Sequence, residues 1–351
     1  MQSEVEITCP LCGGQAELKY DRFPGYQEPE TFEIFHCQGC RAGFSMPRIK
    51  DTQVIYDNIY RHGELVPAYK RYWKYAEEVK KAKDPLNYLA QAEASYWGVR
   101  EALKEIAKER KGIRILEAGS GLGYLTYSLN RSGYQAFGLD ISETSVAQAK
   151  KNYGDYYFHG DLFEYAGTGS NLFDVVIATE VIEHLNDPLV FVEALLKLLK
   201  PGGHLMLTTP NKSFFPEEII WATENPPVHC WWFSEESMNY MADKTGTKNR
   251  FVDLSGYYDK HFYRVDLNIF RNGFPLKPTL TEMGDVIAGN VSATSQQGSL
   301  RRFLIAYLPQ LNSLLVCIKA SWLRKKSASE PNILVCKKRG VVFCALFTKQ
   351  A

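Results

Sequence analysis

From residue 113 onward, short apolar runs alternate with stretches of helical periodicity. This alternation is typical of a parallel sheet whose strands are joined by crossover helices. The run at 173–179 is apolar except at Asp174 and Thr179, which predicts a strand buried on both faces. The strands of the sheet are predicted at 113–116, 134–139, 156–159, 173–179, 204–209, 251–257 and 332–338.

Helix limits are clearest between the fourth and fifth predicted strands. Asp187 can cap a helix whose first turn contains Pro188, and Pro201-Gly-Gly ends that helix. A later helix is predicted to end near Lys244. The segment 260–330 is too long for a hairpin loop, and we expect an inserted helical cap there.

Residues 51–111 are rich in Tyr, Lys, Glu and Ala and contain few glycines. Apolar side chains recur at helical spacing between Tyr88 and Ile106, which predicts a helical connector packed against the following domain. Acidic residues are interleaved with the lysines, so a solvated face is favoured over a nucleic-acid track. The chain is thus interpreted as three parts, at 1–50, 51–111 and 112–340.

Composition and charge narrow the class of protein. The chain has 351 residues, 45% apolar and 23% charged, which argues against long-range disorder. Lys and Arg total 41 and Asp and Glu total 40, so a net charge of +1 provides no global attraction to nucleic acid or acidic membranes. We find no secretory signal and no convincing transmembrane segment. A cytoplasmic enzyme is expected, as a monomer or a homodimer.

Four of the eight cysteines form two Cys-x-x-Cys pairs, Cys9 with Cys12 and Cys37 with Cys40. Each such turn directs two thiolates at one ion, and four thiolates make a closed tetrahedral zinc site. The pairs therefore predict a structural zinc ribbon at 1–50, with no open position for catalysis. Free thiols and an iron–sulfur cluster are the alternatives.

A glycine-rich loop, Glu117-Ala-Gly119-Ser120-Gly121-Leu-Gly123, follows the first predicted strand and precedes a helix-compatible sequence. Its glycines allow the backbone to approach a ligand closely and to point N–H groups at it. The spacing differs from the Gly-x-Gly-x-x-Gly of dinucleotide sites, and the preceding acid would repel a pyrophosphate. The loop is therefore interpreted as a site for another nucleoside ligand.

Acidic residues also follow the next two predicted strands. Asp140 lies 21 residues after Gly119, where a carboxylate can accept hydrogen bonds from ribose hydroxyls. Asp161 follows the third strand and can accept from an adenine amino group. Glu117 can face a cationic amino-acid group, at least through ordered water. Three acids around a glycine loop favour a positively charged nucleoside.

On these residues, and on Pro201-Gly-Gly-His-Leu before the fifth strand, the segment 112–212 resembles the class I S-adenosylmethionine-dependent methyltransferases. The resemblance implies an α/β fold with a doubly wound seven-stranded sheet of order 3-2-1-4-5-7-6, an antiparallel last strand, and S-adenosylmethionine as the cofactor. The cofactor-binding residues that it implies are Glu117, Gly119, Ser120, Gly121, Gly123, Asp140, Ile141, Asp161, Leu162, Thr179 and Glu180.

The fourth strand ends in Thr179-Glu180-Val-Ile-Glu183-His184, at the edge where doubly wound sheets bind ligands. One helical turn would place Glu180, Glu183 and His184 on one face. This turn, with His229 in a later loop, resembles the ubiquinone-pathway O-methyltransferases and the methyltransferases that act on small-RNA ribose. The resemblance implies a magnesium-type ion on Glu180, Glu183, His184 and His229. There are two alternatives. In the first, His184 or His229 acts as a metal-free base and is oriented by a carboxylate such as Glu183. In the second, the turn has only a positioning role.

Aromatic residues are dense between 211 and 240, where they can wall an acceptor pocket or form a lid over the sheet. Cys230, among them, is interpreted as a buried thiol rather than a nucleophile. The aromatic residues are Phe214, Phe215, Trp221, Trp231, Trp232, Phe233 and Tyr240.

The leading interpretation is an enzyme that methylates a small molecule at a hydroxyl of an aromatic, sugar or natural-product compound. One alternative is an RNA or other macromolecule methyltransferase that uses the zinc ribbon for recognition. Another is a cofactor-binding module without catalysis. The acidic segment between Cys12 and Cys37 and the near-neutral charge favour a small-molecule acceptor over nucleic acid.

Overall fold

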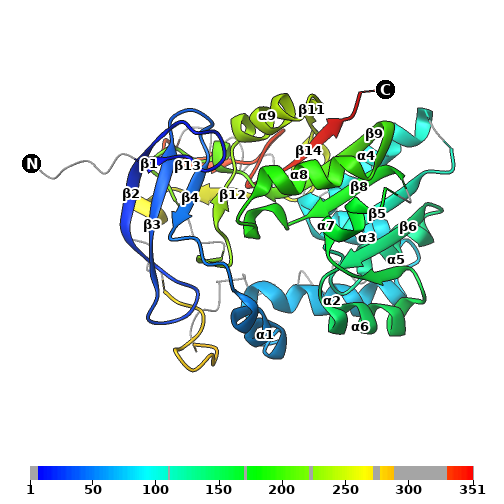
Figure 1. Ribbon diagram of the computed structural model, residues 1–351, viewed down its shortest axis with the longest axis horizontal. Coiled ribbons are helices and arrows are strands. Elements are labelled where there is room, and N and C mark those ends of the chain that lie inside the picture. Colours follow the sequence, from blue (N-terminus) through cyan, green and yellow to red (C-terminus); the bar gives the residue numbers. More distant parts are fainter. Residues whose placement is uncertain are drawn as a thin grey trace, which may run out of the picture.

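The computed structural model describes residues 7–109, 111–169, 172–220, 224–271, 277–287 and 330–350. A seven-stranded sheet with helices on both faces forms the larger part, and a five-stranded sheet lies beside it (Figure 1). None of the helices in these described ranges combines the length and apolarity needed to cross a bilayer.

The order of the seven-stranded sheet confirms the predicted fold class. Along the sheet the strands are β11, β14, β9, β8, β5, β6 and β7, and β14 runs antiparallel to both of its neighbours. In chain order this is 3-2-1-4-5-7-6 with a reversed last strand. The strands span Arg114–Ala118 (β5), Gln135–Asp140 (β6), Tyr157–His159 (β7), Phe173–Thr179 (β8), Leu199–Pro210 (β9), Lys248–Phe251 (β11) and Val342–Thr348 (β14).

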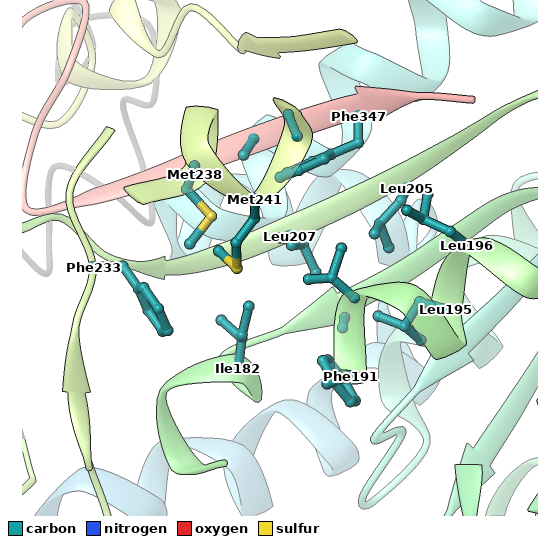
Figure 2. Close-up of a cluster of buried hydrophobic side chains, with 14 of the residues drawn as sticks. Ile182, Phe191, Leu195, Leu196, Leu205, Leu207, Phe233, Met238, Met241 and Phe347 are labelled. Atoms are coloured by element: carbon teal, nitrogen blue, oxygen red, sulfur yellow. The ribbon is translucent and has the colours of Figure 1, made fainter. Parts of the chain in front are cut away.

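Successive side chains of the central strands point to opposite faces, as the pleat of a strand requires. Ile115 and Val175 pack with helices α4 to α6, whereas Leu116 and Val176 pack with α7 to α9, so the sheet separates two apolar cores. Figure 2 shows part of the second core, around Leu207. The helices here are α5 (Tyr124–Arg131), α6 (Glu143–Tyr153), α7 (Leu162–Gly167), α8 (Pro188–Lys197) and α9 (Glu235–Lys244), with short turns η1 (Ile182–His184) and η2 (Lys212–Phe214).

The predicted connector forms four helices, and the predicted periodicity at 88–106 is interrupted at Glu93. This residue has extended backbone angles (φ −139°, ψ 148°) and separates α3 from α4. Its carboxylate accepts a hydrogen bond from the Tyr75 hydroxyl and pairs with Arg71, both at 2.8 Å, which holds the break in place. The helices are α1 (Gln53–Arg61), α2 (Pro67–Lys81), α3 (Pro85–Ala92) and α4 (Ala94–Glu109).

The N-terminal segment forms an antiparallel sheet of order β1-β2-β3-β4-β10. Its fifth strand, β10 (Trp231–Trp232), comes from a distant part of the chain, after β9, and pairs with β4. The sheet that contains the cysteine pairs is therefore continuous with the later aromatic loop. Its other strands are β1 (Ile7–Thr8), β2 (Gln15–Pro24), β3 (Thr31–Cys37) and β4 (Gly43–Met46).

Two predicted strands lie elsewhere. The strand expected at 251–257 ends at Phe251, because the Asp253 side chain accepts a hydrogen bond from the Ser255 amide and a helical turn, α10 (Ser255–Tyr258), follows. The strand expected at 332–338 contributes only β13 (Ile333–Val335), which pairs with β12 (Arg264–Asp266) outside the main sheet.

The seventh strand is instead β14, beyond the predicted domain end at 340. Its place between β9 and β11 requires a strand that is apolar on both faces, and five consecutive residues of β14 are buried. The predicted helical insertion at 260–330 lies largely outside the described residues. Its described part contains β12, the short helix α11 (Asn268–Arg271) and an irregular segment at 277–287.

Gly123 should be needed for packing rather than for ligand contact. It has φ +79°, and an added Cβ would lie 2.6 Å from the Tyr157 ring and 2.7 Å from the Ala149 Cβ. Gly123→Ala is expected to lower the free energy of unfolding by about 3 kcal/mol, from left-handed strain plus overpacking. Gly133→Ala is the control, because Gly133 has φ +88° with open space around it; it should cost about 1 kcal/mol. Equal losses in urea denaturation would contradict the packing role.

Candidate functional site

One cavity of about 1310 Å³ lies at the carboxyl ends of β5, β6 and β8. The glycine loop, Asp140, the Glu180 turn and His229 all line it. The volume exceeds the roughly 300–1,000 Å³ of most small-ligand pockets, so the cavity has room for two ligands side by side.

The glycine loop is tied to the neighbouring strand by its own backbone. The amides of Gly119 and Ser120 donate to the Leu139 carbonyl at 2.8 and 3.1 Å. Gly119 has φ +75° and Gly121 has φ +47°, and a Cβ at Gly119 would lie 2.7 Å from Val181. Only glycine fits this conformation and spacing without strain. Gly119, Ser120 and Gly121 line the cavity, as predicted for cofactor contacts, whereas Gly123 does not.

Asp140 faces the same loop from β6. Its carboxylate accepts hydrogen bonds from the Gly121 amide at 2.7 Å and from the Ser142 amide at 2.8 Å. Burial raises the pKa of Asp140, and these two bonds oppose the rise. Each carboxylate oxygen can still accept another hydrogen bond, so ribose hydroxyls can bind here.

Glu117 is buried below the loop, with 3% of its surface exposed. Its carboxylate accepts hydrogen bonds from the amide and the hydroxyl of Thr126 in α5. Burial raises the pKa of Glu117 to about 8, although these bonds act in the opposite direction. A cationic ligand group in the cavity would favour the charged carboxylate, so the predicted role remains chemically reasonable.

The other predicted cofactor residues differ in position. Ile141 is 72% exposed at the cavity wall, and Thr179 also lines the cavity. Asp161 and Leu162 are not among the lining residues. Asp161 caps α7, because its Oδ1 accepts from the amides of Phe163 and Glu164. Its second carboxylate oxygen remains able to accept from an adenine amino group, and that role stays a prediction.

Glu180 does not share a helical face with Glu183 and His184. It leaves β8 with φ +53°, and η1 begins only at Ile182. The Glu180 carboxylate accepts hydrogen bonds from the hydroxyls of Ser95 and Thr208, both at 3.0 Å. Because the backbone turns in the left-handed region at Glu180, the predicted i, i+3, i+4 spacing does not apply.

Glu183, His184 and His229 form a cluster whose potential ligand atoms all lie within 4.8 Å of one another. The two imidazole rings are 4.6 Å apart, centroid to centroid, and the His229 Nε2 is 3.9 Å from the Glu183 Oε1. The Thr209 hydroxyl donates to the Glu183 Oε2 at 2.9 Å. Within the described ranges, the buried Glu183 Oε1 has no hydrogen-bond partner. A buried oxygen of this kind is costly unless a ligand or an ion satisfies it.

The protonation state of His184 follows from its surroundings. Its Nδ1 lies 2.7 Å from the Val228 carbonyl oxygen and 3.0 Å from the Tyr56 hydroxyl. A carbonyl only accepts, so the hydrogen lies on Nδ1. Burial lowers the pKa of His184 to about 4, which leaves the ring neutral at pH 7 with a lone pair on Nε2. Burial also lowers the pKa of His229, and the neighbouring His184 adds to this effect.

The connector helices contribute residues that the sequence analysis did not identify. Tyr56 from α1, Arg71 and Tyr72 from α2, Glu93 and Ser95 all line the cavity. The tyrosine-rich composition of 51–111 was the only signal, and it does not show which side chains face a ligand.

Most of the aromatic loop is core rather than pocket wall. Trp231, Trp232 and Phe233 are each at most 1% exposed, and Phe215 lines the cavity. Cys230 is buried, as expected for a structural thiol, and burial raises its pKa. Trp221 lies outside the described residues.

The four N-terminal cysteines form a second cluster, with sulfur atoms within 4.8 Å of one another. The Sγ atoms of Cys9 and Cys40 are 3.8 Å apart, and those of Cys12 and Cys37 are 3.4 Å apart. Four Zn–S bonds of about 2.3 Å in a tetrahedron place the sulfurs about 3.8 Å apart, so the spacing is close to that of a zinc site.

Comparison with known proteins places residues 88–250 in the family described as "Methyltransferase domain". This part of the chain matches a methyltransferase domain. Over 171 residues the chain is 36% identical to the human mitochondrial ubiquinone biosynthesis O-methyltransferase, a match that covers 42% of this chain and 46% of that protein. The ubiquinone biosynthesis O-methyltransferase of Aromatoleum aromaticum is 32% identical over 108 residues, 29% of this chain and 46% of the relative.

The chain thus spans less than half of the length of these curated relatives. Among solved structures, a SAM-dependent methyltransferase from Archaeoglobus fulgidus aligns with a TM-score of 0.37 and 14% identity, over 71% of this chain and 94% of that protein. The family model at 88–250 and the curated relatives, rather than this structural alignment, support the predicted methyltransferase family.

Glu117 should make the stability of the methyltransferase domain depend on pH. The pKa is about 8 in the folded protein against 4.5 for a free side chain, so between these values the folded state holds a proton that the unfolded state releases. Stability is therefore lost as the pH rises through this window, by up to about 1.4 kcal/mol per pH unit. Glu117→Gln should remove this contribution, so denaturation between pH 5 and 8 should show a shallower decline than in the wild type. Parallel profiles would contradict the assignment.

Proposed function

We propose that the protein transfers the methyl group of S-adenosylmethionine to a hydroxyl oxygen of a small molecule. The observation that carries the proposal is the single cavity, which joins the glycine loop and Asp140 to the Glu183, His184 and His229 cluster. A cofactor bound at the first group would place its sulfonium next to an acceptor at the second.

Methyl transfer is an in-line displacement, in which an acceptor lone pair forms the new bond to carbon as the carbon–sulfur bond breaks. In the proposed complex the loop amides and Asp140 hold the nucleoside, and Glu117 lies near the cationic part of the cofactor. The acceptor hydroxyl loses its proton toward the side of the cavity that His184 and His229 line. The main contribution of the protein is to align the acceptor oxygen, methyl carbon and sulfur.

A neutral imidazole can accept a proton, but a pKa of about 4 makes His184 a weak base at pH 7. This favours a bound cation over a metal-free base. The unsatisfied Glu183 Oε1 and the available His184 Nε2 fit such an ion, and the Nδ1 contact with a carbonyl is the usual support for a metal-binding histidine. When bound, the ion would lower the pKa of the acceptor hydroxyl.

The donor set does not fit the magnesium that the resemblance implies. Magnesium prefers oxygen ligands in an octahedron, whereas two imidazoles and one carboxylate suit manganese, iron or zinc. Glu180, the fourth expected ligand, is held by Ser95 and Thr208 instead. We therefore propose a transition-metal ion on Glu183, His184 and His229.

For the N-terminal cluster we propose structural zinc, because the sulfur spacing and the two Cys-x-x-Cys turns fit a closed four-thiolate site. The division into ribbon, connector and catalytic domain remains part of this proposal. A location of the protein in the cytoplasm is also part of this proposal.

A small-molecule acceptor agrees with the relatives, which are named for O-methylation in ubiquinone biosynthesis. Two cations of the ribbon are already used in ion pairs. Lys19 and Arg41 lie 3.2 and 2.6 Å from the carboxylate of Glu217. They are therefore less suited to hold RNA phosphates.

Asp140→Ala should weaken the binding of S-adenosylhomocysteine by about 10- to 100-fold, because charge-assisted hydrogen bonds to the ribose are lost. Asp155→Ala, which removes one exposed carboxylate outside the cavity, is the control and should bind as the wild type does. Calorimetry measures both. Failure of the wild type to bind would overturn the proposed function.

His184→Gln should lower kcat by about 100-fold and leave the affinity for S-adenosylhomocysteine within about two-fold, because it acts on the acceptor side alone. His204→Gln, on β9 outside the cavity, is the matched control. Turnover with phenols and sugars is measured in chelator-treated buffer, then with added Mn²⁺ or Mg²⁺. Full turnover without metal would argue for a metal-free base instead.

A further inference from the structure

The ribbon sheet and the acceptor side of the cavity share a strand. Phe44 pairs with Trp231 and Gly43 with Trp232, so β10 completes the ribbon sheet from the catalytic part. β10 starts two residues after His229, which is 7% exposed and lines the cavity.

The backbone of Cys230 connects the two sites directly. Its carbonyl accepts a hydrogen bond from the Ser45 amide of β4 at 3.0 Å. Its amide donates to the Glu183 carbonyl at 2.8 Å. Residue 230 therefore lies between the ribbon on one side and the Glu183 turn on the other.

The second cysteine pair supports the same segment. The Cys40 carbonyl accepts a hydrogen bond from the Ser234 hydroxyl at 2.7 Å, and β4 begins three residues after Cys40. Arg48, just after β4, lies with its guanidinium carbon 4.1 Å from the centre of a Trp231 ring and donates to the Cys230 carbonyl at 3.4 Å. The contacts thus follow the segment from Cys230 to Ser234, directly after His229.

We propose that the ion held by the four cysteines positions the acceptor-side residues His229 and Glu183, so that the ribbon is part of the active site. A segment as small as the ribbon depends on its metal for a defined structure. Loss of the ion releases β4, and with it the hydrogen bonds that hold the Cys230 backbone. The glycine loop and Asp140 belong to the main sheet and have no part in this chain of contacts.

Hydrogen exchange on the full-length protein tests this without any acceptor. We expect release of the four-cysteine ion by a mercurial reagent, in Mn²⁺-containing buffer that keeps the proposed Glu183, His184 and His229 site filled, to accelerate exchange in 225–235 by about ten-fold or more, with less than a two-fold change in 113–125. Metal analysis should show the loss of one zinc per chain, and removal of the mercurial with excess thiol followed by added zinc should restore protection. Unchanged exchange in 225–235, or equal acceleration in 113–125, would overturn the coupling.

A substitution outside the zinc site tests the same coupling between ribbon and cavity, because all four cysteine thiolates remain. Arg48→Met keeps much of the side-chain volume but removes the contacts with Trp231 and the Cys230 carbonyl. It should retain zinc, show about three-fold faster exchange in 225–235 and lower kcat with unchanged affinity for S-adenosylhomocysteine. The matched control is Leu18→Ala, on the ribbon surface with 45% of the side chain exposed, which should alter none of these. An Arg48 variant indistinguishable from this control would also overturn the coupling.

The expected change in kcat rests on the proposed methyl transfer, whereas the expected change in hydrogen exchange does not. If the zinc-loaded protein binds no S-adenosylhomocysteine and methylates no acceptor, the proposed function fails, and exchange still decides the coupling. If it is active, zinc removal should lower kcat by about ten-fold or more while cofactor affinity is retained. Full activity without zinc would leave the proposed function intact and refute the coupling.

Discussion

Three consecutive residues, 228 to 230, hold the Glu183 and His184 side of the cavity together, the first and last of them through their backbone. The Val228 carbonyl sets the tautomer of His184, and His229 lies within reach of the Glu183 carboxylate. The Cys230 amide and carbonyl join the Glu183 turn to the ribbon. Backbone polar groups buried away from water must find partners, so this short segment has little freedom to move once both neighbours are in place.

The second constraint is the free-energy cost of burying acidic side chains around the cavity. Burial raises the pKa of Glu117, Glu180 and Glu183, and the closeness of Glu180 adds to the effect on Glu183. Glu117, with a pKa of about 8, is mostly protonated at pH 7 in the free protein, and its ionisation lowers the stability of the main sheet at high pH. A sulfonium and an ammonium group, or a bound cation, would relieve that cost. The same buried acids would favour a ligand that carries positive charge over a neutral one.

The local patterns that could be predicted are those in which neighbours in sequence are also partners in space. The glycine loop has the predicted place after β5, and Asp187 caps α8 by accepting a hydrogen bond from the Val190 amide. The apolar run at 173–179 became the buried strand β8 without change. By contrast, the Glu180 turn was predicted with helical spacing, and its left-handed residue could not be recognised from the amino-acid type.

By itself, the amino-acid sequence determined the alternation of strands and helices, the glycine loop and the two cysteine pairs, because strand periodicity, loop glycines and Cys-x-x-Cys turns are local features. The order of the sheet was predicted only through the family resemblance that these motifs carry. Only the tertiary structure decided that β10 joins the ribbon sheet, that Val342–Thr348 closes the main sheet, and that connector residues such as Tyr56 face the cavity. These depend on contacts between segments far apart in the chain. Local periodicity carries no information on which of several apolar segments will be buried against which partner.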